Sequence, residues 1–151
     1  MTYCMNNLKR ILLTFLLASF AVSALAHAAT NKEIVVSYYK TAYIEHNPQK
    51  AVDLYVGDPF IQHNPKVADG KKAFVDFITP FFKSHPDHKV EIKRVLADGD
   101  LVSLHVHAKS DKTERGRAIV AIFRVKSGKI VEHWDVIQDI PETSANSNTM
   151  F

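Results

Sequence analysis

The sequence predicts an α+β domain in which N-terminal helices pack across one side of a twisted antiparallel sheet, an arrangement that can enclose a cavity. Hydrophobic residues recur with the 3.6-residue period of helices up to about residue 81, and from His88 onward they alternate with the period of strands. The composition, with 46% hydrophobic and 23% charged residues, five Gly and six Pro in 151 residues, is globular. It excludes disordered and collagen-like proteins.

Three helices are expected in the first half of the chain. The first begins at the capping box Thr30-Asn31-Lys32-Glu33, where a hydroxyl and a carboxylate each satisfy a free amide, and runs to about Glu45. Asn47-Pro48 supplies the cap and the first-turn proline of a second, short helix. The third helix starts near Gly70, and we expect Pro80 to kink or split it.

The strands follow a brief extended piece at residues 60–63. Their expected ranges are 88–97, 100–109, 117–126 and 129–138. Asp98-Gly99 suits a two-residue turn between the first two. A two-residue turn at Ser127-Gly128 would need a positive φ at Ser127, so we expect a three-residue loop, Lys126-Ser127-Gly128, with Gly128 left-handed.

This last loop sets which side chains meet on the final two strands. Three loop residues put Ala121 opposite His133 and Ile119 opposite Asp135. Because His133 and Asp135 are two residues apart, both lie on one side of the sheet, among apolar neighbours such as Phe123. A carboxylate in a dry apolar cavity has a raised pKa and can act as an acid or base near neutral pH, where histidine already titrates. The pattern predicts proton transfer.

Two more histidines lie on the second strand. The Asp98-Gly99 turn pairs Ile92 with His105, and His107 shares the face of His105. Whether this face coincides with that of His133 depends on strand pairing that the intervening loop does not fix. Three imidazoles could meet at a zinc ion, but His-x-His on a half-buried strand is common without one, so we expect no bound metal.

The polar residues of the last strand also have a plainer interpretation. His133 and Asp135 could bond each other, or pair with Arg117 or Arg124 at the sheet surface. Trp134 points to the opposite face, which is more typical of a core or dimer-interface residue than of a substrate platform.

The remaining histidines are less informative. His63-Asn64-Pro65 is most simply an Asx-Pro turn, although it is also the one other polar pair that the first helix and the sheet could enclose together. His46, His85 and His88 fall at the ends of elements and are expected to be exposed to solvent.

The first 26 residues have the three regions of a secretory signal peptide. Lys9-Arg10 precede an apolar run of 15 residues, Ile11 to Leu25, and Ala24-Leu25-Ala26 is a small-x-small cleavage pattern. The run is shorter than the ~20 residues that a membrane-spanning helix needs. We therefore expect a periplasmic or secreted protein without a membrane span after cleavage, with one domain at residues 27–141 and a polar tail at residues 142–151.

Cleavage also changes the composition of the chain. Removing Lys9 and Arg10 lowers the net charge from +3 to +1, and no long basic run remains, so nucleic acid is not an expected partner. Cys4 is the only cysteine, so the cleaved chain can form no internal disulfide and no Cys-ligated zinc site.

Three stretches of the sequence resemble the SnoaL-like family of the NTF2-like superfamily, which is related to polyketide cyclases. They are Gln62-His63-Asn64-Pro65, Gly99-Asp100 ahead of His105-Val106-His107, and Phe123-Arg124-Val125 followed by Gly128-Lys129-Ile130-Val131-Glu132-His133-Trp134-Asp135. The resemblance covers about residues 31–140.

The resemblance implies a cone of curved antiparallel sheet closed by helices around a deep apolar pocket, often in a homodimer. It implies an acid/base role for Asp135 in an intramolecular aldol closure, a place for Asn64 in the pocket wall, and no metal or organic cofactor. Ala121 stands where the cyclases carry a polar residue, so one catalytic group of the family is missing here.

These observations give two main expectations of function. The first is a cofactor-free lyase or isomerase acting on a small apolar carbonyl compound. Asp135 would move the proton, and His133 with His105 or His107 would steady the enolate oxygen. His63, Asn64 and Phe123 would contact the substrate. The second is a periplasmic module that binds an apolar ligand without chemistry. A structural dimer with a vestigial pocket is a third possibility, which a pocket filled by its own side chains would support.

Overall fold

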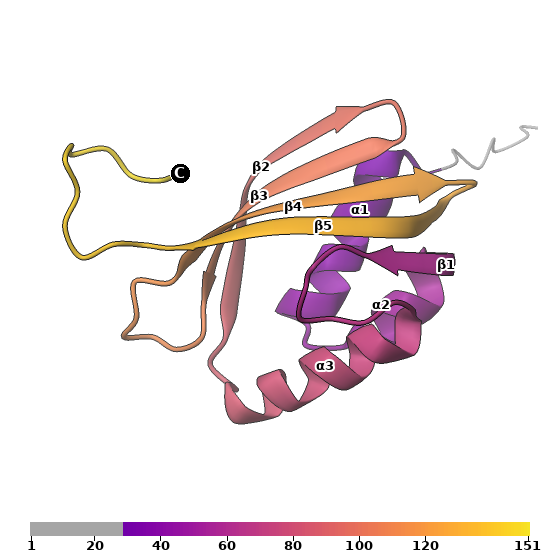
Figure 1. The fold of residues 1–151 in the computed structure, drawn as a ribbon, viewed down its shortest axis with the longest axis horizontal. Helices are drawn as coiled ribbons and strands as arrows, with labels where there is room; N and C mark the ends of the chain where they lie inside the picture. Colours follow the sequence, from indigo (N-terminus) through magenta and orange to yellow (C-terminus); the bar gives the residue numbers. More distant parts are fainter. Residues whose placement is uncertain (1–28) are drawn as a thin grey trace, which may run out of the picture.

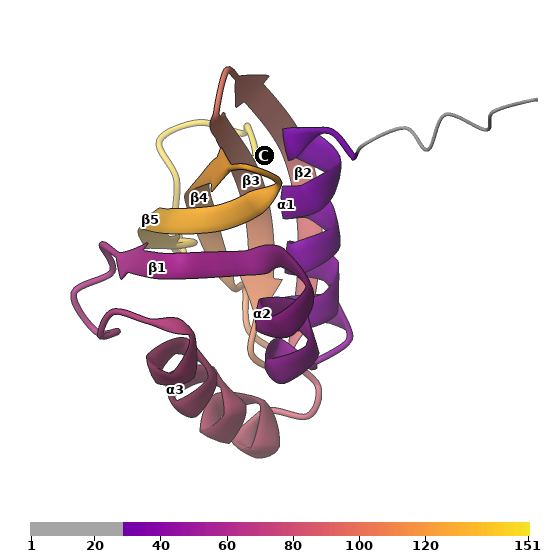
Figure 2. The same cartoon turned by 90° about the vertical axis from the view of Figure 1, so that its right-hand side faces the viewer.

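The computed structural model describes residues 29–151, and Figure 1 shows helices packed against a curved five-stranded sheet. The signal peptide predicted for residues 1–26 lies outside the described residues. None of the helices in residues 29–151 is long and apolar enough to span a membrane. Figure 2 shows α1 lying along one face of the sheet and α3 beneath it.

The first helix begins at the predicted capping box. The Thr30 Oγ1 atom accepts from the Glu33 amide at 3.2 Å, and the Glu33 carboxylate accepts from the Thr30 amide at 2.7 Å. The α-helix α1 (Asn31–Tyr39) continues into a π-helical turn, η1 (Lys40–Ile44). The next helix, α2 (Pro48–Tyr55), is capped by Asn47, as predicted.

The third helix, α3 (Lys71–Ser84), continues through Pro80, so of the two expected effects, a kink or a split, the split does not occur. A proline removes the amide that would bond to the carbonyl four residues earlier, here that of Asp76. Both Pro80 and Asp76 are exposed, so water can satisfy that carbonyl and the helix need not break.

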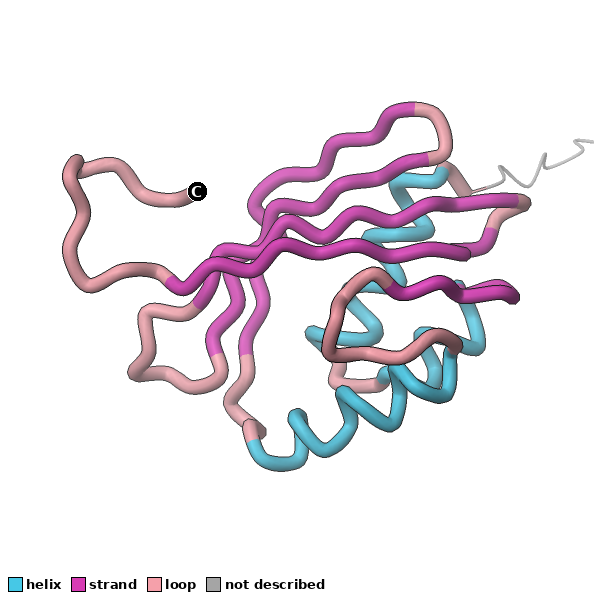
Figure 3. Tube along the Cα trace, viewed as in Figure 1, coloured by secondary structure: helices cyan, strands magenta, loops and turns pink. Residues whose placement is uncertain are grey.

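The sheet has the strand order β1-β5-β4-β3-β2 (Figure 3). Its strands are β1 (Val56–Gln62), β2 (Lys89–Asp98), β3 (Leu101–Lys109), β4 (Arg117–Lys126) and β5 (Lys129–Asp139). The last four are antiparallel, as predicted, but β1 pairs with β5 in parallel. The sheet is therefore mixed. The extended piece predicted at residues 60–63 is the end of this longer edge strand, whose partner is distant in sequence.

The hairpin between β4 and β5 differs from the prediction in its turn and its register. Ser127 and Gly128 form a two-residue turn with φ of 49° and 75°, and Lys126 pairs with Lys129. The register then shifts at Val131, which forms a one-residue bulge, so that Phe123 lies opposite His133 and Ala121 opposite Asp135. The two-residue turn alone would have put His133 and Asp135 on the face opposite to the predicted one. The one-residue bulge returns them to the predicted face.

The hairpin between β2 and β3 also differs from the prediction. Its turn is Gly99-Asp100, one residue later than expected, and a bulge at Lys93 shifts the register. His105 therefore lies opposite Arg94 and His107 opposite Glu91. Both side chains lie on the outer face of the sheet, since the alternate residues of β3 are buried under the helices.

The core lies between the inner face of the sheet and the helices. Its fully buried larger side chains are Tyr38, Phe123, Leu104, Ile130, Val35, Val52, Val102 and Val106. Tyr38 of α1 packs edge-on against Phe123 of β4 with ring centroids 5.5 Å apart. This contact joins the first helix to the centre of the sheet.

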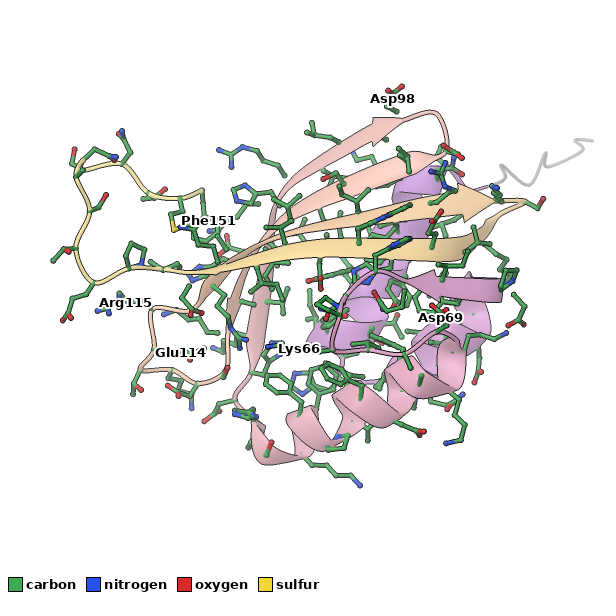
Figure 4. All side chains as sticks on the ribbon, in the orientation of Figure 1. Lys66, Asp69, Asp98, Glu114, Arg115 and Phe151 are labelled. Carbon is green, nitrogen blue, oxygen red and sulfur yellow. The ribbon has the colours of Figure 1, made fainter. Side chains whose placement is uncertain are left out.

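The polar tail predicted for residues 142–151 forms no helix or strand, and it turns back toward the sheet (Figure 1). Its last side chain, Phe151, stacks on the His107 ring at 4.5 Å and lies 5.3 Å from the His105 ring. The tail thus covers part of the outer face of β3. Figure 4 shows Phe151 beside the sheet.

Candidate functional site

A cavity of about 200 Å³ lies between the inner face of the sheet, α3 and the segment that joins β1 to α3. Most of its wall is aromatic or aliphatic, and it is not filled by its own side chains. The apolar lining residues are Val67, Phe74, Phe77, Ile78, Phe81, Val90, Ala108, Ile119, Ala121 and Ile137, and the polar ones are Tyr39, Tyr43, Gln62, Asn64, Lys66, His88, Arg117, His133 and Asp135.

Asp135 and Asn64 meet at the wall of this cavity. The Asn64 Nδ2 atom donates to both carboxylate oxygens of Asp135, each at 2.9 Å. The Asn64 Oδ1 atom accepts from the backbone amide of Lys66 at 2.9 Å, which fixes the orientation of the Asn64 amide group. No Lys or Arg in residues 29–151 forms an ion pair with Asp135. The carboxylate is therefore held in place by a neutral donor and keeps free acceptor capacity.

His133 is buried beside this pair and is held in one tautomer. The Gln62 Oε1 atom accepts from the backbone amide of Asn64 at 3.0 Å and contacts the His133 Nδ1 atom at 2.8 Å. Because an oxygen can only accept, Nδ1 must carry the proton, and Nε2 is left with a lone pair. The His133 ring also stacks on Phe123 at 4.7 Å.

Burial lowers the pKa of His133 to about 4, against a smaller opposing effect of Asp135 and a further lowering by His63. The ring is therefore neutral at neutral pH. In this state His133 accepts a hydrogen bond at Nε2 rather than donating one, which conflicts with the expectation that it would steady an enolate oxygen.

Two phenols from the first helical segment complete this end of the cavity. Tyr39 and Tyr43 stack with ring centroids 4.4 Å apart, at the junction of α1 and η1. Burial raises the pKa of both, and the nearby charge of Asp135 contributes to the rise. No described residue hydrogen-bonds either hydroxyl, so both phenols remain protonated donors that can serve a ligand oxygen.

His88 lies elsewhere in the cavity wall and is buried, contrary to the prediction. Its Nδ1 atom and the Nε2 atom of His46 are buried without a hydrogen-bond partner among residues 29–151. Burial, then the charges of His46, Arg117 and His85, lower the pKa of His88 to about 4, and Glu114 opposes them. His46 and His85 are half-buried, because both pack against aromatic rings of α3. Ends of elements are therefore not always exposed.

Several predicted ligand contacts do not line the cavity. His105 and His107 lie on the outer face of the sheet, away from His133, so the three imidazoles cannot meet at one metal ion. His63 also lies outside. It stacks on Trp134 at 4.6 Å and contacts the Glu132 carboxylate at 2.9 Å. The reason is alternation, since β1 and β5 place Gln62 and His133 inward and the next side chains outward.

Phe123 is a core residue rather than a ligand contact. It is 1% exposed and lies between Tyr38 and the His133 ring, which it supports from behind. Ala121 does line the cavity, directly opposite Asp135, so a methyl group faces the carboxylate where the resemblance implied a polar residue.

Sequence reasoning missed Gln62, Tyr39, His88, Arg117 and Lys66 as cavity residues. Gln62 could have been found, because it immediately precedes the His-Asn-Pro stretch and alternation puts it on the side of His133. No local pattern marks His88 or Arg117. Their places depend on how α3 and the β3–β4 loop pack against the sheet.

The fold and the cavity define an α+β protein of the NTF2-like fold with a largely apolar pocket, and solved structures share this architecture. AclR of Streptomyces galilaeus, a candidate hydroxylase, matches with a TM-score of 0.59 at 19% identity, over 74% of this chain and 80% of its own. A candidate polyketide cyclase of Acidithiobacillus ferrooxidans matches with 0.58 at 15% identity, over 75% and 91%. A candidate ketosteroid isomerase of Kribbella flavida matches with 0.59 at 16% identity, over 77% and 83%.

At such identities these likenesses establish the fold and no more. The family is established by sequence, because the model of the SnoaL-like polyketide cyclase family matches residues 33–143. The protein belongs to that family. Among proteins with curated functions, none matches the sequence.

Proposed function

We propose that the protein is a cofactor-independent enzyme of the lyase or isomerase type, which moves a proton on the carbon next to a carbonyl group of a small, largely apolar compound. The observation that carries this proposal is the Asp135 carboxylate, oriented by Asn64 at the wall of an apolar cavity. An isolated, oriented carboxylate in contact with an apolar ligand is a suitable base.

In the proposed reaction an Asp135 oxygen takes a proton from the α-carbon, and the C–H electrons form the C=C bond of an enolate. Tyr39 or Tyr43 donates its O–H to the enolate oxygen. Asp135 then returns the proton to a different carbon in an isomerisation, or the enolate carbon attacks a second carbonyl in an aldol closure and the alkoxide that forms takes the proton from Asp135. His133 acts as an acceptor at Nε2, because its N–H is held by Gln62.

Deuterium exchange tests this proposal without knowledge of the natural substrate. With 2-tetralone in D₂O, we expect the protein to accelerate loss of the α-proton NMR signals, and Asp135→Asn to abolish the acceleration while circular dichroism stays unchanged. Asp139→Asn, an exposed change at the end of the same strand, is the matched control. Equal exchange with wild-type protein and Asp135→Asn would remove Asp135 from the mechanism.

Ala121 favours a second candidate, a binding module that holds an apolar ligand without chemistry. The methyl group of Ala121 faces Asp135 where a second polar group could assist proton transfer. Tight binding of apolar carbonyl compounds with no exchange, or a ligand carried through purification and identified by mass spectrometry, supports this candidate over the enzyme.

We also propose export and self-association. The basic and apolar segment before residue 27 supports cleavage and release to the periplasm or the medium, which mass spectrometry of the mature N-terminus in cell fractions can test. The outer face of the sheet exposes the cross-strand pair Val120 and Val136, the latter 71% exposed, which supports a homodimer. Light scattering of wild-type protein and Val136→Lys tests that proposal.

A further inference from the structure

Arg117 brings a positive charge into the cavity wall without a matching negative one. Its Nη2 atom donates to the Ser110 Oγ atom at 2.8 Å, and this is its one hydrogen bond within residues 29–151. A guanidinium has five N–H donors, so most of its capacity is unused. Arg117 is only partly exposed, and a cation that is partly removed from water is unfavourable unless an anion accompanies it.

The carboxylates near Arg117 do not neutralise it. Asp139 is its cross-strand partner on the same face, yet the two groups form no ion pair. The Glu114 carboxylate is bonded to the backbone amide of Ser110 instead, in the β3–β4 loop (Figure 4). Among the charged side chains that line the cavity, Lys66 and Arg117 are cations and Asp135 is the single anion.

His88 adds an independent observation at the same cavity. It is 8% exposed, lines the cavity, and has a buried Nδ1 atom without a partner. His88 and Arg117 line the same cavity, and the charge of Arg117 contributes, after burial and the charge of His46, to lowering the pKa of His88. A bound anion next to Arg117 would remove that contribution and favour the protonated ring.

The two charged groups at the ends of the cavity, Asp135 and Arg117, lie on the neighbouring strands β5 and β4. Ala121 faces Asp135, and Arg117 is four residues away along β4, which is about 13 Å of strand. A ligand that reaches both therefore has a carbonyl group at one end and its anionic group several bonds away.

We propose that the ligand of this cavity is an apolar carbonyl compound that also carries a carboxylate, which Arg117 binds through its free N–H groups while the carbonyl lies at Asp135 and Asn64. Only the placement of the ligand's carbonyl group at Asp135 rests on the proposed function. Arg117 is suited to the task because its planar fork can hold both oxygens of a carboxylate at once.

The test uses a series of phenyl keto acids, 4-oxo-4-phenylbutanoate, 5-oxo-5-phenylpentanoate and 6-oxo-6-phenylhexanoate, each with its methyl ester. Binding is measured by calorimetry. We expect at least one acid to bind wild-type protein about tenfold or more tighter than its ester, as a charge-assisted hydrogen bond implies. Arg117→Gln is expected to abolish the preference, whereas Arg94→Gln on the outer face keeps it.

Three outcomes would overturn the inference: no acid binds, esters bind as tightly as acids, or Lys66→Gln rather than Arg117→Gln removes the preference. NMR titration gives a second readout, in which a bound acid raises the pKa of His88 and a bound ester does not. The deuterium exchange is measured with 2-tetralone, an uncharged ketone, on wild-type protein and Asp135→Asn, whereas the binding of the acids and esters needs no turnover. Failure of the anion site and failure of the proton-transfer proposal are therefore separable.

Discussion

The Nδ2 atom of Asn64 lies 2.9 Å from both carboxylate oxygens of Asp135, although 71 residues separate the two side chains in sequence. The amide cannot rotate away, because its own oxygen is held by the Lys66 backbone amide. A single residue between β1 and α3 thus aims the carboxylate of β5 into the cavity.

The first prediction concerns this pair. Asn64→Ala removes both hydrogen bonds to the Asp135 carboxylate. A hydrogen bond to a charged group is worth about 1.5–3 kcal/mol. We expect the rate of ketone deuterium exchange per mole of protein to fall about 10- to 100-fold. Asn148→Ala makes the same change in the exposed tail and is expected to keep the full rate. An undiminished rate in Asn64→Ala would show that Asp135 is positioned without it.

The second prediction concerns the tautomer of His133. In Gln62→Glu a carboxylate replaces the neutral acceptor of the Nδ1 proton. A carboxylate favours the imidazolium, so we expect the pKa of His133 to rise from about 4 toward the ordinary range, as measured by NMR titration of the ring. In Gln62→Leu the buried N–H loses its acceptor, and the free energy of unfolding is expected to fall by about 1–3 kcal/mol. Unchanged values in both variants would contradict the assigned hydrogen bond.

The third prediction is that stability falls between about pH 6.5 and pH 4. Burial lowers the pKa of His133 and His88 to about 4 in the folded protein, so across this window the unfolded chain binds protons that the folded one does not. Stability is then greatest above pH 6.5 and is lost as the pH falls toward 4, by on the order of 3 kcal/mol per histidine. Urea denaturation across this range measures the slope.

A pair of variants isolates one of these histidines. His88→Phe is expected to reduce the pH slope and to keep the stability near pH 7, because a buried unpartnered nitrogen is replaced by an apolar ring. His105→Phe makes the same change on the outer face of the sheet and is the matched control for stability near pH 7. The same slope in His88→Phe and the wild-type protein would contradict the proposed burial effect.

The fourth prediction concerns the turn between β4 and β5. Ser127 has a φ of 49°, which non-glycine residues adopt at a cost of about 1–2 kcal/mol, and Asn tolerates this conformation better. Ser127→Asn is therefore expected to raise the free energy of unfolding by about 0.5 kcal/mol or more in urea titrations. Lys112→Asn in another exposed loop serves as control. A three-residue loop with Ser127 right-handed would gain nothing from the change.

The sequence alone was sufficient for the order of elements and for the helix starts. The capping box at Thr30 and the cap at Asn47 are local, since each needs only residues within one turn. Alternation also placed His133 and Asp135 on one face, although the loop that was used to derive their register was wrong. The true register differs by two residues, and a shift of two keeps every side chain on its face.

Only the tertiary structure decided which face of each strand is inside, and what reaches the cavity. A bulge such as that at Val131 adds one residue to a strand, and no motif in the sequence marks its position. The parallel pairing of β1 with β5 likewise turns Gln62 and Asn64 toward β5 and His63 away from the cavity. Alternation determines which residues share a face, but long-range packing determines which face is buried. That packing put His105 and His107 outside and left Arg117 and His88 in the cavity wall.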